Sequence, residues 1–261
     1  GEHNMSTHFN NFLFKHTSRA LMVVLCALST GAYAQITNPG FESGDLSGWN
    51  AVVSGQADPI AVTSGETVTS AGTISPSLSD NFYAFTSQGG PGSSFLTQDF
   101  TVQAGTNRIF FDIAINNDGG SFVTPDPISF DFSGSSNQQA RFDILAPGAS
   151  FDTEDPADII ATGFQTQPGD PLSSDWERFD IDVSAELAPF VGQTVTLRFV
   201  QVDNQGFFNL AIDNLSVGNA PPPDAGGEAE SIPVMPHWLL LLLVLGVAKM
   251  GTRRTPARRK H

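Results

Sequence analysis

Carboxylates are the main chemically capable side chains of this sequence. Of the 27 Asp and Glu in the 261-residue chain, all but Glu2 lie between residues 35 and 231. The same segment contains no Lys, and its only basic side chains are Arg108, Arg141, Arg178 and Arg198. Carboxylates in such excess favour divalent cations and repel nucleic acid and anionic lipid. A solvated acidic surface, as in some secreted or salt-adapted proteins, would give the same composition.

Little in the sequence supports catalysis. Residues 35–219 contain no His and no Cys, which excludes Ser-His-Asp and Cys-His chemistry and a His-ligated zinc in that segment. A carboxylate pair could hydrolyse a glycosidic bond, but with so many acidic residues the presence of a pair is uninformative. The glycines lie in turn-like clusters rather than in a phosphate-binding loop. We therefore expect that the protein is not an enzyme.

The N-terminus has the three parts of a secretory signal peptide. Lys15 and Arg19 precede a short apolar run at 20–28, and Ala-Tyr-Ala at 32–34 precedes Gln35. Because the run is too short to span a bilayer, we predict a signal peptide over 1–34, with a retained membrane anchor as the alternative. The single cysteine, Cys26, would leave with this segment, so disulfides would not hold the mature protein together.

The C-terminus has a matching arrangement. A Pro/Gly-rich linker at 220–231 precedes a tail at 232–261. This tail contains an Ile-Pro pair, a Trp, an apolar run at 238–248 and a basic end, marked by Ile232, Pro233, Trp238, Arg253 and Arg254.

The tail resembles the bacterial PEP-CTERM class of sorting signal, in particular the variant called IPTL-CTERM. The resemblance implies an exosortase-like membrane protease as a partner and membrane attachment through the C-terminal helix before processing. It also implies export to the cell surface, outer membrane or extracellular matrix of a Gram-negative bacterium that produces exopolysaccharide. A plain C-terminal membrane anchor, with its basic end in the cytoplasm, is the alternative.

Alternating apolar and polar residues predict β-strands between residues 35 and 217. Clear examples lie at 108–115, 128–132, 140–144, 179–183 and 195–199. Clusters of Gly, Asn, Ser and Asp separate them, as expected for turns. We therefore predict one all-β domain over 35–219. Its expected fold is an antiparallel β-sandwich, flanked by an N-terminal signal helix and a C-terminal hydrophobic helix.

The edges of this domain carry recognisable motifs. They are N-P-G-F-E at 38–42, G-W at 48–49, G-Q-T-V-T-L-R-F at 192–199 and I-D-N-L-S-V at 212–217. These motifs resemble those of galactose-binding-like jelly rolls, especially carbohydrate-binding modules of the cellulase and xylanase type. The resemblance implies a jelly-roll sandwich and a glycan or exopolysaccharide as partner.

Glu42 and Asp213 belong to the first and last of these motifs. Because the first and last strands of such a sandwich lie close together, the two carboxylates could approach and would repel unless a cation lay between them. In the family the matching Glu and Asp hold a structural calcium, so the resemblance implies Ca²⁺ bound by Glu42 and Asp213. The alternative is that each carboxylate caps a loop by accepting backbone N–H bonds.

Sugar binding in such modules combines aromatic rings that stack on pyranose faces with hydrogen-bonding side chains. The candidate rings are Tyr83, Trp176 and Phe207, and the candidate polar partners are Arg108, Asp112 and Gln201. Arg108 and Asp112 share the face of their strand that lies opposite its apolar face, which could form a concave polar surface.

We therefore expect a non-catalytic, exported, carbohydrate-binding protein. The alternative is a structural cell-surface or biofilm-matrix protein without a small-ligand site. That alternative predicts that the Tyr and Trp rings are buried or scattered.

Overall fold

The computed structural model describes residues 36–77, 82–86, 90–124 and 128–218. The predicted signal peptide, linker and sorting tail lie outside the described residues. So do the sorting-signal residues Ile232, Pro233, Trp238, Arg253 and Arg254. Across the described ranges, no helix is both long enough and apolar enough to cross a membrane.

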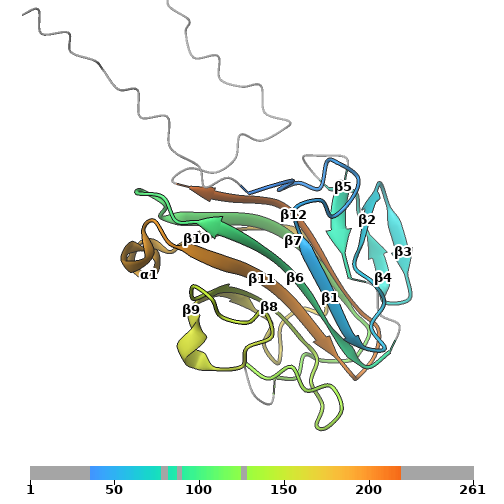
Figure 1. Ribbon diagram of the computed structural model, residues 1–261. Helices are drawn as coiled ribbons and strands as arrows, with labels where there is room; N and C mark the ends of the chain where they lie inside the picture. Colours follow the sequence, from blue (N-terminus) through green and yellow to red (C-terminus); the bar gives the residue numbers. More distant parts are fainter. Residues whose placement is uncertain (1–35, 78–81, 87–89, 125–127, 219–261) are drawn as a thin grey trace, which may run out of the picture. The chain divides into compact units, whose positions relative to one another are not determined.

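The described chain forms an antiparallel β-sandwich of two five-stranded sheets (Figure 1). The first sheet has the order β1 (Asn50–Gly55), β6 (Gly92–Thr101), β11 (Thr194–Asp203), β8 (Gln139–Leu145) and β9 (Ile159–Gln165). The second sheet has the order β10 (Ser173–Asp182), β7 (Arg108–Asn117), β12 (Phe208–Gly218), β5 (Phe82–Phe85) and β2 (Ala61–Ser64). This confirms the predicted all-β sandwich, while the two flanking helices fall outside the described residues.

The connections follow a jelly-roll pattern. From β5 to β12 the chain changes sheet at every step except between β8 and β9, which are neighbours in the first sheet. A separate hairpin of β3 (Thr67–Thr69) and β4 (Gly72–Ile74) precedes β5. The helical turns are η1 (Pro156–Asp158), α1 (Ser184–Leu187) and η2 (Ala188–Phe190).

The main core lies between the two sheets and is built by the alternation seen in the sequence. Phe111 on β7 is fully buried at its centre. Its ring meets Phe142 of β8 at 4.7 Å and Phe199 of β11 at 5.2 Å between centroids, so it joins the second sheet to the first. Phe179 of β10 stacks on it at 5.3 Å from within its own sheet. Four of the five predicted strand segments are therefore confirmed, in β7, β8, β10 and β11, although β10 ends one residue before the predicted Val183.

The predicted strand at 128–132 is wrong. Residues 128–132 form an irregular segment that lies against the outer face of the first sheet. The ring of Phe130 packs edge-on against Phe95 of β6 at 5.0 Å. The backbone of this segment forms hydrogen bonds with side chains rather than with a neighbouring strand. Asn137 Nδ2 donates to the carbonyl of Asp131 at 2.9 Å, and Glu154 accepts the N–H of Phe130 at 2.6 Å. The alternation therefore reflects one apolar side laid on a sheet, not a strand.

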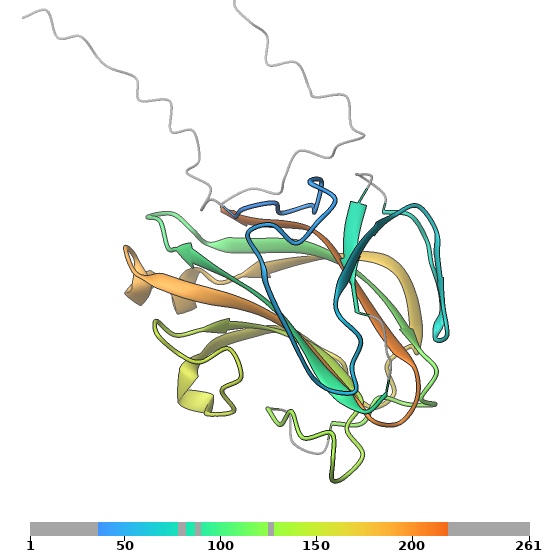
Figure 2. The same ribbon diagram turned by 45° about the vertical axis from the view of Figure 1, so that its right-hand side comes forward.

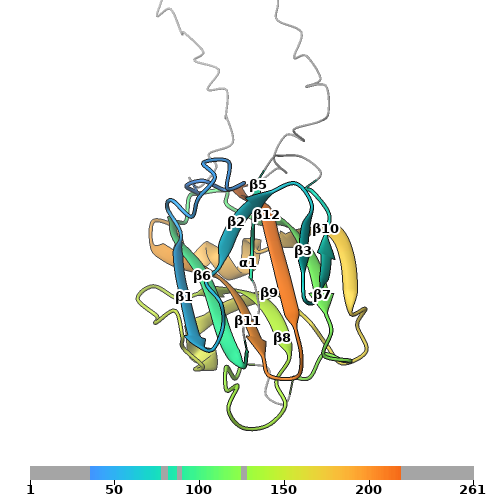
Figure 3. The ribbon, with the colours of Figure 1, turned by 90° about the vertical axis from the view of Figure 1, so that its right-hand side faces the viewer.

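The outer face of the second sheet is covered in a similar way by the β3–β4 hairpin. Figure 3 shows the hairpin beside β12 and β7. Ile74 of β4 is buried there against a second apolar cluster, whose other buried members are Tyr83, Phe85, Ala114 and Ala211. Asn116 of β7 donates to the carbonyl of Thr73 at 2.9 Å and fixes the hairpin to the sheet.

The two ends of the described segment meet at one end of the sandwich, as Figure 2 shows. The N–H of Leu215 in β12 donates to the carbonyl of Pro39 at 3.0 Å. The segment 36–49 is a loop rather than a strand. It is nevertheless held beside the last strand, as the edge motifs predicted.

Candidate functional site

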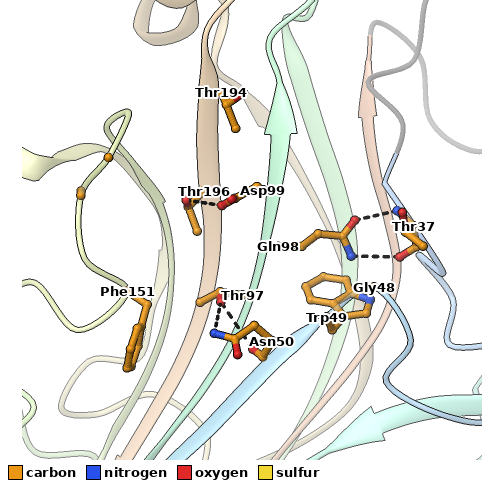
Figure 4. A pocket seen from close by; sticks show the side chains of 12 residues that line it. Thr37, Gly48, Trp49, Asn50, Thr97, Gln98, Asp99, Phe151, Thr194 and Thr196 are labelled. Atoms are coloured by element: carbon orange, nitrogen blue, oxygen red, sulfur yellow. Dashed lines mark hydrogen bonds between the residues drawn. The ribbon is translucent and has the colours of Figure 1, made fainter.

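A groove of about 570 Å³ lies on the outer face of the first sheet. Figure 4 shows Phe151 on one side, Trp49 on the other and strands β6 and β11 between them. The lining comes from five separate segments: Thr37, residues 48–50, residues 97–99, residues 148, 149 and 151, and residues 194 and 196. Its volume falls in the range of small-molecule sites, roughly 300–1,000 Å³.

The floor of the groove is polar. On β6, Thr97 and Asp99 point to the outer face because their neighbours Leu96 and Phe100 belong to the core. The hydroxyl of Thr196 on β11 donates to Asp99 Oδ1 at 2.6 Å, and Asp99 is exposed. Along the same floor, the Thr97 hydroxyl accepts from the Asn50 amide at 3.3 Å. The floor therefore offers hydroxyl, amide and carboxylate groups in a row.

Trp49 borders the groove on one side and is held by the loop before it, but its side chain is only 8% exposed and belongs to the main core. Its ring stacks on Phe41 at 5.3 Å, and its Nε1–H donates to the carbonyl of Asn38 at 3.1 Å. Gly48 before it has φ +85°, and a Cβ there would lie 2.5 Å from Cγ2 of Thr37. Only glycine therefore fits at position 48, which explains the Gly-Trp pair seen in the sequence.

Two further contacts fix this loop. The side-chain amide of Gln98 forms two hydrogen bonds with the backbone of Thr37. It accepts the Thr37 N–H at 2.6 Å and donates to the Thr37 carbonyl at 2.9 Å. Hydrogen bonds from Ser43 and Ser47 lower the pKa of Asp45 to about 2. Asp45 therefore keeps its charge, and the turn keeps these bonds, well below neutral pH.

Phe151 forms the opposite wall from the loop between β8 and η1. Arg198 on β11 holds this loop by donating from Nη1 to the carbonyls of Phe151 at 2.9 Å and Thr153 at 3.0 Å. The Phe151 ring itself packs edge-on against Phe95 at 5.4 Å. The position of the wall thus depends on a buried arginine beneath it.

Arg198 belongs to a buried charge cluster of Arg141, Asp143 and Arg198. The side chains of Arg198 and Asp143 are 0% exposed, and that of Arg141 is 2% exposed. One carboxylate oxygen of Asp143 accepts from Arg141 Nη2 at 2.6 Å, and the other accepts from Arg198 Nη2 at 2.7 Å. Burial lowers the pKa of Arg198 while the Asp143 carboxylate opposes this shift. The cluster is a structural support of the groove rather than part of its surface.

The aromatic residues predicted to bind sugar lie elsewhere. Tyr83 is fully buried under the β3–β4 hairpin, with its hydroxyl donating to the carbonyl of Gly65 at 3.0 Å, and burial raises its pKa. Trp176 is half-buried beside it, with the two rings 5.3 Å apart, and its Nε1–H donates to the carbonyl of Ser75 at 3.0 Å. Phe207 is 44% exposed and borders a separate hollow of about 380 Å³ next to the hairpin.

The predicted polar partners are also engaged in other contacts. Arg108 pairs with Asp180 at 2.6 Å, and Asp112 receives two bonds from Arg178, at 2.8 and 2.9 Å. The polar face of β7 that we expected to be open is thus occupied by ion pairs with β10 at one end and by the hairpin at the other.

Gln201 lies inside the sandwich, where its amide donates to Asp203 at 2.9 Å and to the carbonyl of Phe208 at 2.8 Å. The structure therefore does not bring the six predicted ligand-binding side chains together.

Glu42 contacts Phe82, and Asp213 contacts Ser77. Glu42 accepts the N–H of Phe82 at 2.9 Å. Asp213 accepts hydrogen bonds from the Ser77 hydroxyl and, at 2.7 Å, from the backbone N–H of Asn214. Asp213 is fully buried and lies opposite Asp112 in the β12–β7 pairing. Among the described residues no cluster of three or more His, Cys, Asp or Glu side chains could hold a metal ion. A cation here would therefore need carbonyl or hydroxyl oxygens besides the two carboxylates.

The backbone around this pair is unusual. The described non-glycine residues with positive φ are Asn38 (49°), Phe41 (57°) and Asn214 (53°). Phe41 and Asn214 adjoin the predicted calcium ligands Glu42 and Asp213, and the carbonyl of Asn38 accepts the N–H of Phe41 at 3.3 Å. Conformations of this kind cost of order 1–3 kcal/mol each and concentrate at functional sites. The strained backbone and the buried carboxylate fit a cation site, and the observed N–H bonds fit the loop-capping alternative equally well.

The comparisons with known proteins assign no family. No protein-family model and no curated protein matches the chain. Similar solved structures include the carbohydrate-binding module TmCBM61 in complex with β-1,4-galactotriose, at 13% identity over 71% of this chain and 98% of that chain, with a TM-score of 0.41. A cyclase from Fischerella sp. TAU shares 18% identity over 74% of this chain and 100% of its own, with a TM-score of 0.43.

An adhesin domain of Lys-gingipain from Porphyromonas gingivalis W83 shares 10% identity over 68% of this chain and 94% of its own, with a TM-score of 0.41. Values this low transfer no function, so the function of the chain has to be inferred from its own groove.

Proposed function

We propose that the protein is a non-catalytic carbohydrate-binding protein and that the groove between Trp49 and Phe151 is its binding site. The observation that carries the proposal is the polar floor beside the partly exposed ring of Phe151, with Trp49, which is only 8% exposed, at the opposite edge. Sugars present apolar ring faces and a rim of hydroxyl groups, so a site for them pairs aromatic surface with hydrogen-bonding side chains.

The floor matches sugar hydroxyls because it contains both donors and acceptors. The Asn50 amide and the hydroxyls of Thr194 and Thr196 can donate and accept, and Asp99 accepts. These groups lie on three adjacent antiparallel strands, β1, β6 and β11, which favours an extended ligand lying across the sheet.

Non-catalytic binding is supported by the composition of the lining. Asp99 is the single carboxylate among the groove residues of the described segments. Hydrolysis of a glycosidic bond usually needs two carboxyl groups about 5–9.5 Å apart. A protein that only binds the sugar needs one carboxyl group or none.

Removing the wall ring tests the site. We expect Phe151→Ala to weaken binding to the preferred polysaccharide of a glycan array by about tenfold, because it removes one aromatic contact surface. Isothermal titration calorimetry would measure the change. Phe207→Ala is the matched control, since this exposed phenylalanine lies outside the groove.

If the control variant lost binding and Phe151→Ala did not, the ligand site would be the hollow beside the hairpin. If a folded sample bound no glycan, the structural surface or matrix role would replace this proposal.

Calcium is a second part of the proposal. Ca²⁺ held by Glu42 and Asp213 would fasten the strained 38–42 loop to β12, close to Trp49. We expect millimolar Ca²⁺ to raise the melting temperature of the protein and EDTA to lower it, with no response in Asp213→Asn. A melting temperature that is the same in Ca²⁺ and EDTA would instead support loop capping by the two carboxylates.

Export and C-terminal processing complete the proposal, and they are supported by the sequence patterns at 1–34 and 232–261. Such a protein would reach the bacterial surface or matrix, where polysaccharide is available. Mass spectrometry of the mature chain would check both cleavages, and a chain that retained both ends would refute this part.

A further inference from the structure

Every arginine in the described part of the chain has an acidic partner. Arg108 pairs with Asp180, Arg178 with Asp112, and both Arg141 and Arg198 with Asp143. The described ranges contain no Lys and no His. On the described surface, every basic side chain that could bind a carboxylate or sulfate of a sugar is thus already paired with an aspartate.

The groove itself carries a negative charge, in addition to the acidic surface around it. Asp99 is exposed on its floor, and its Oδ1 is bonded to the Thr196 hydroxyl at 2.6 Å. None of the twelve lining residues is basic. A uronate or sulfated sugar in the groove would therefore meet Asp99 and the acidic surface without a compensating cation.

These observations determine which glycans the groove can accept. Proteins bind sugar carboxylates and sulfates mainly through charge-assisted bonds from Arg and Lys. Where these are absent, desolvation of the anion and repulsion by Asp99 both oppose binding. Uncharged sugar hydroxyls meet neither of these penalties, because the threonines, Asn50 and Asp99 can form hydrogen bonds with them.

We propose that the groove selects uncharged glycans over anionic ones and that Asp99 is the residue that determines this selectivity. This inference rests on the proposed function, since it concerns the ligand class of the same site. It names the chemistry of the ligand, a neutral polysaccharide, and predicts that polyuronates and sulfated glycans are excluded.

Matched polysaccharide pairs test the selectivity. The probes are methyl-esterified against de-esterified homogalacturonan, and hydroxyethyl cellulose against carboxymethyl cellulose, with the intact protein in low salt. We expect the neutral member of any bound pair to bind at least about tenfold more tightly. This ratio should shrink as NaCl approaches about 1 M, because salt screens the repulsion.

Charge variants of Asp99 test whether this residue determines the selectivity. Removing one unit charge about 5 Å from a ligand carboxylate in a water-like medium changes affinity by about fourfold. We therefore expect Asp99→Asn to lower the neutral-to-anionic ratio by about fourfold and Asp99→Lys to lower it further. Glu177→Lys, an exposed charge reversal on β10 of the other sheet, is the matched control and should leave the ratio unchanged.

The outcomes separate the two proposals. Tighter binding of the anionic member, weakened by Phe151→Ala, would overturn the selectivity and keep the groove as the binding site. Equal effects of Asp99→Lys and Glu177→Lys would show that overall charge, not Asp99, sets the ratio. Failure of a folded protein to bind any neutral or anionic probe would overturn both proposals together.

Discussion

Replacing Asp143 by Asn is expected to lower the free energy of unfolding by about 3–5 kcal/mol, because it leaves two buried arginines without their shared carboxylate. Arg141 and Arg198 are almost completely inaccessible to water, so solvent cannot replace the lost partner. Urea denaturation followed by tryptophan fluorescence would measure the loss. We also expect weaker ligand binding, since Arg198 holds the Phe151 loop through two carbonyls.

A matched substitution provides the control. Asp180→Asn removes the carboxylate from a surface pair with Arg108, at the same 2.6 Å separation, where both side chains remain partly exposed. Water and salt screen such a pair, so its loss should cost only a small fraction of the Asp143 effect. If the two variants were equally stable, the buried cluster would not support the groove as described. A triple variant, Arg141→Met, Asp143→Leu and Arg198→Met, should recover much of the lost stability because it removes the buried charges together.

Replacing Phe111 by Ala is expected to cost about 3–5 kcal/mol of unfolding free energy. The ring is fully buried and contacts Phe142 and Phe199 of the opposite sheet, so its removal leaves a cavity where the two sheets meet. The measurement is again the urea midpoint together with the slope of the transition.

Phe207→Ala serves as the control for this deletion, because the same side chain is removed from a position that is 44% exposed. It should cost about 1 kcal/mol or less. A similar loss for the two variants would indicate that the sandwich does not depend on contact between its sheets at Phe111.

The fold was predictable where one face of a strand is buried and the other is solvated or paired. Strand β10 is the clearest case, since Phe179 and Ile181 pack against the core while Asp180 and Asp182 between and after them are exposed. Strand β6 was not predicted, because Phe95 is buried on the outer face while Leu96 is buried on the inner one. Where both faces of a strand carry apolar side chains, the alternation disappears from the sequence.

The candidate site was less predictable. Five separate chain segments form the groove, and none has a local pattern that marks it. Sequence reasoning selected Tyr83 and Trp176 for their ring types, but the β3–β4 hairpin buries the face on which they lie. Such coverage depends on where a hairpin folds back, which residue spacing does not encode. The Gly-Trp pair at 48–49 was the one available signal, and it marked the loop that borders the groove.

The position of a bound glycan would show directly whether the groove is the binding site. ¹H–¹⁵N chemical-shift mapping, with the neutral oligosaccharide that binds best on an array, would show where the ligand lies. The proposal predicts the largest shifts at Asn50, Thr97, Asp99, Phe151 and Thr196, with little change at Val68 and Phe207. Shifts concentrated at Val68 and Phe207, or no shifts at saturating ligand, would contradict the assignment of the groove as the binding site.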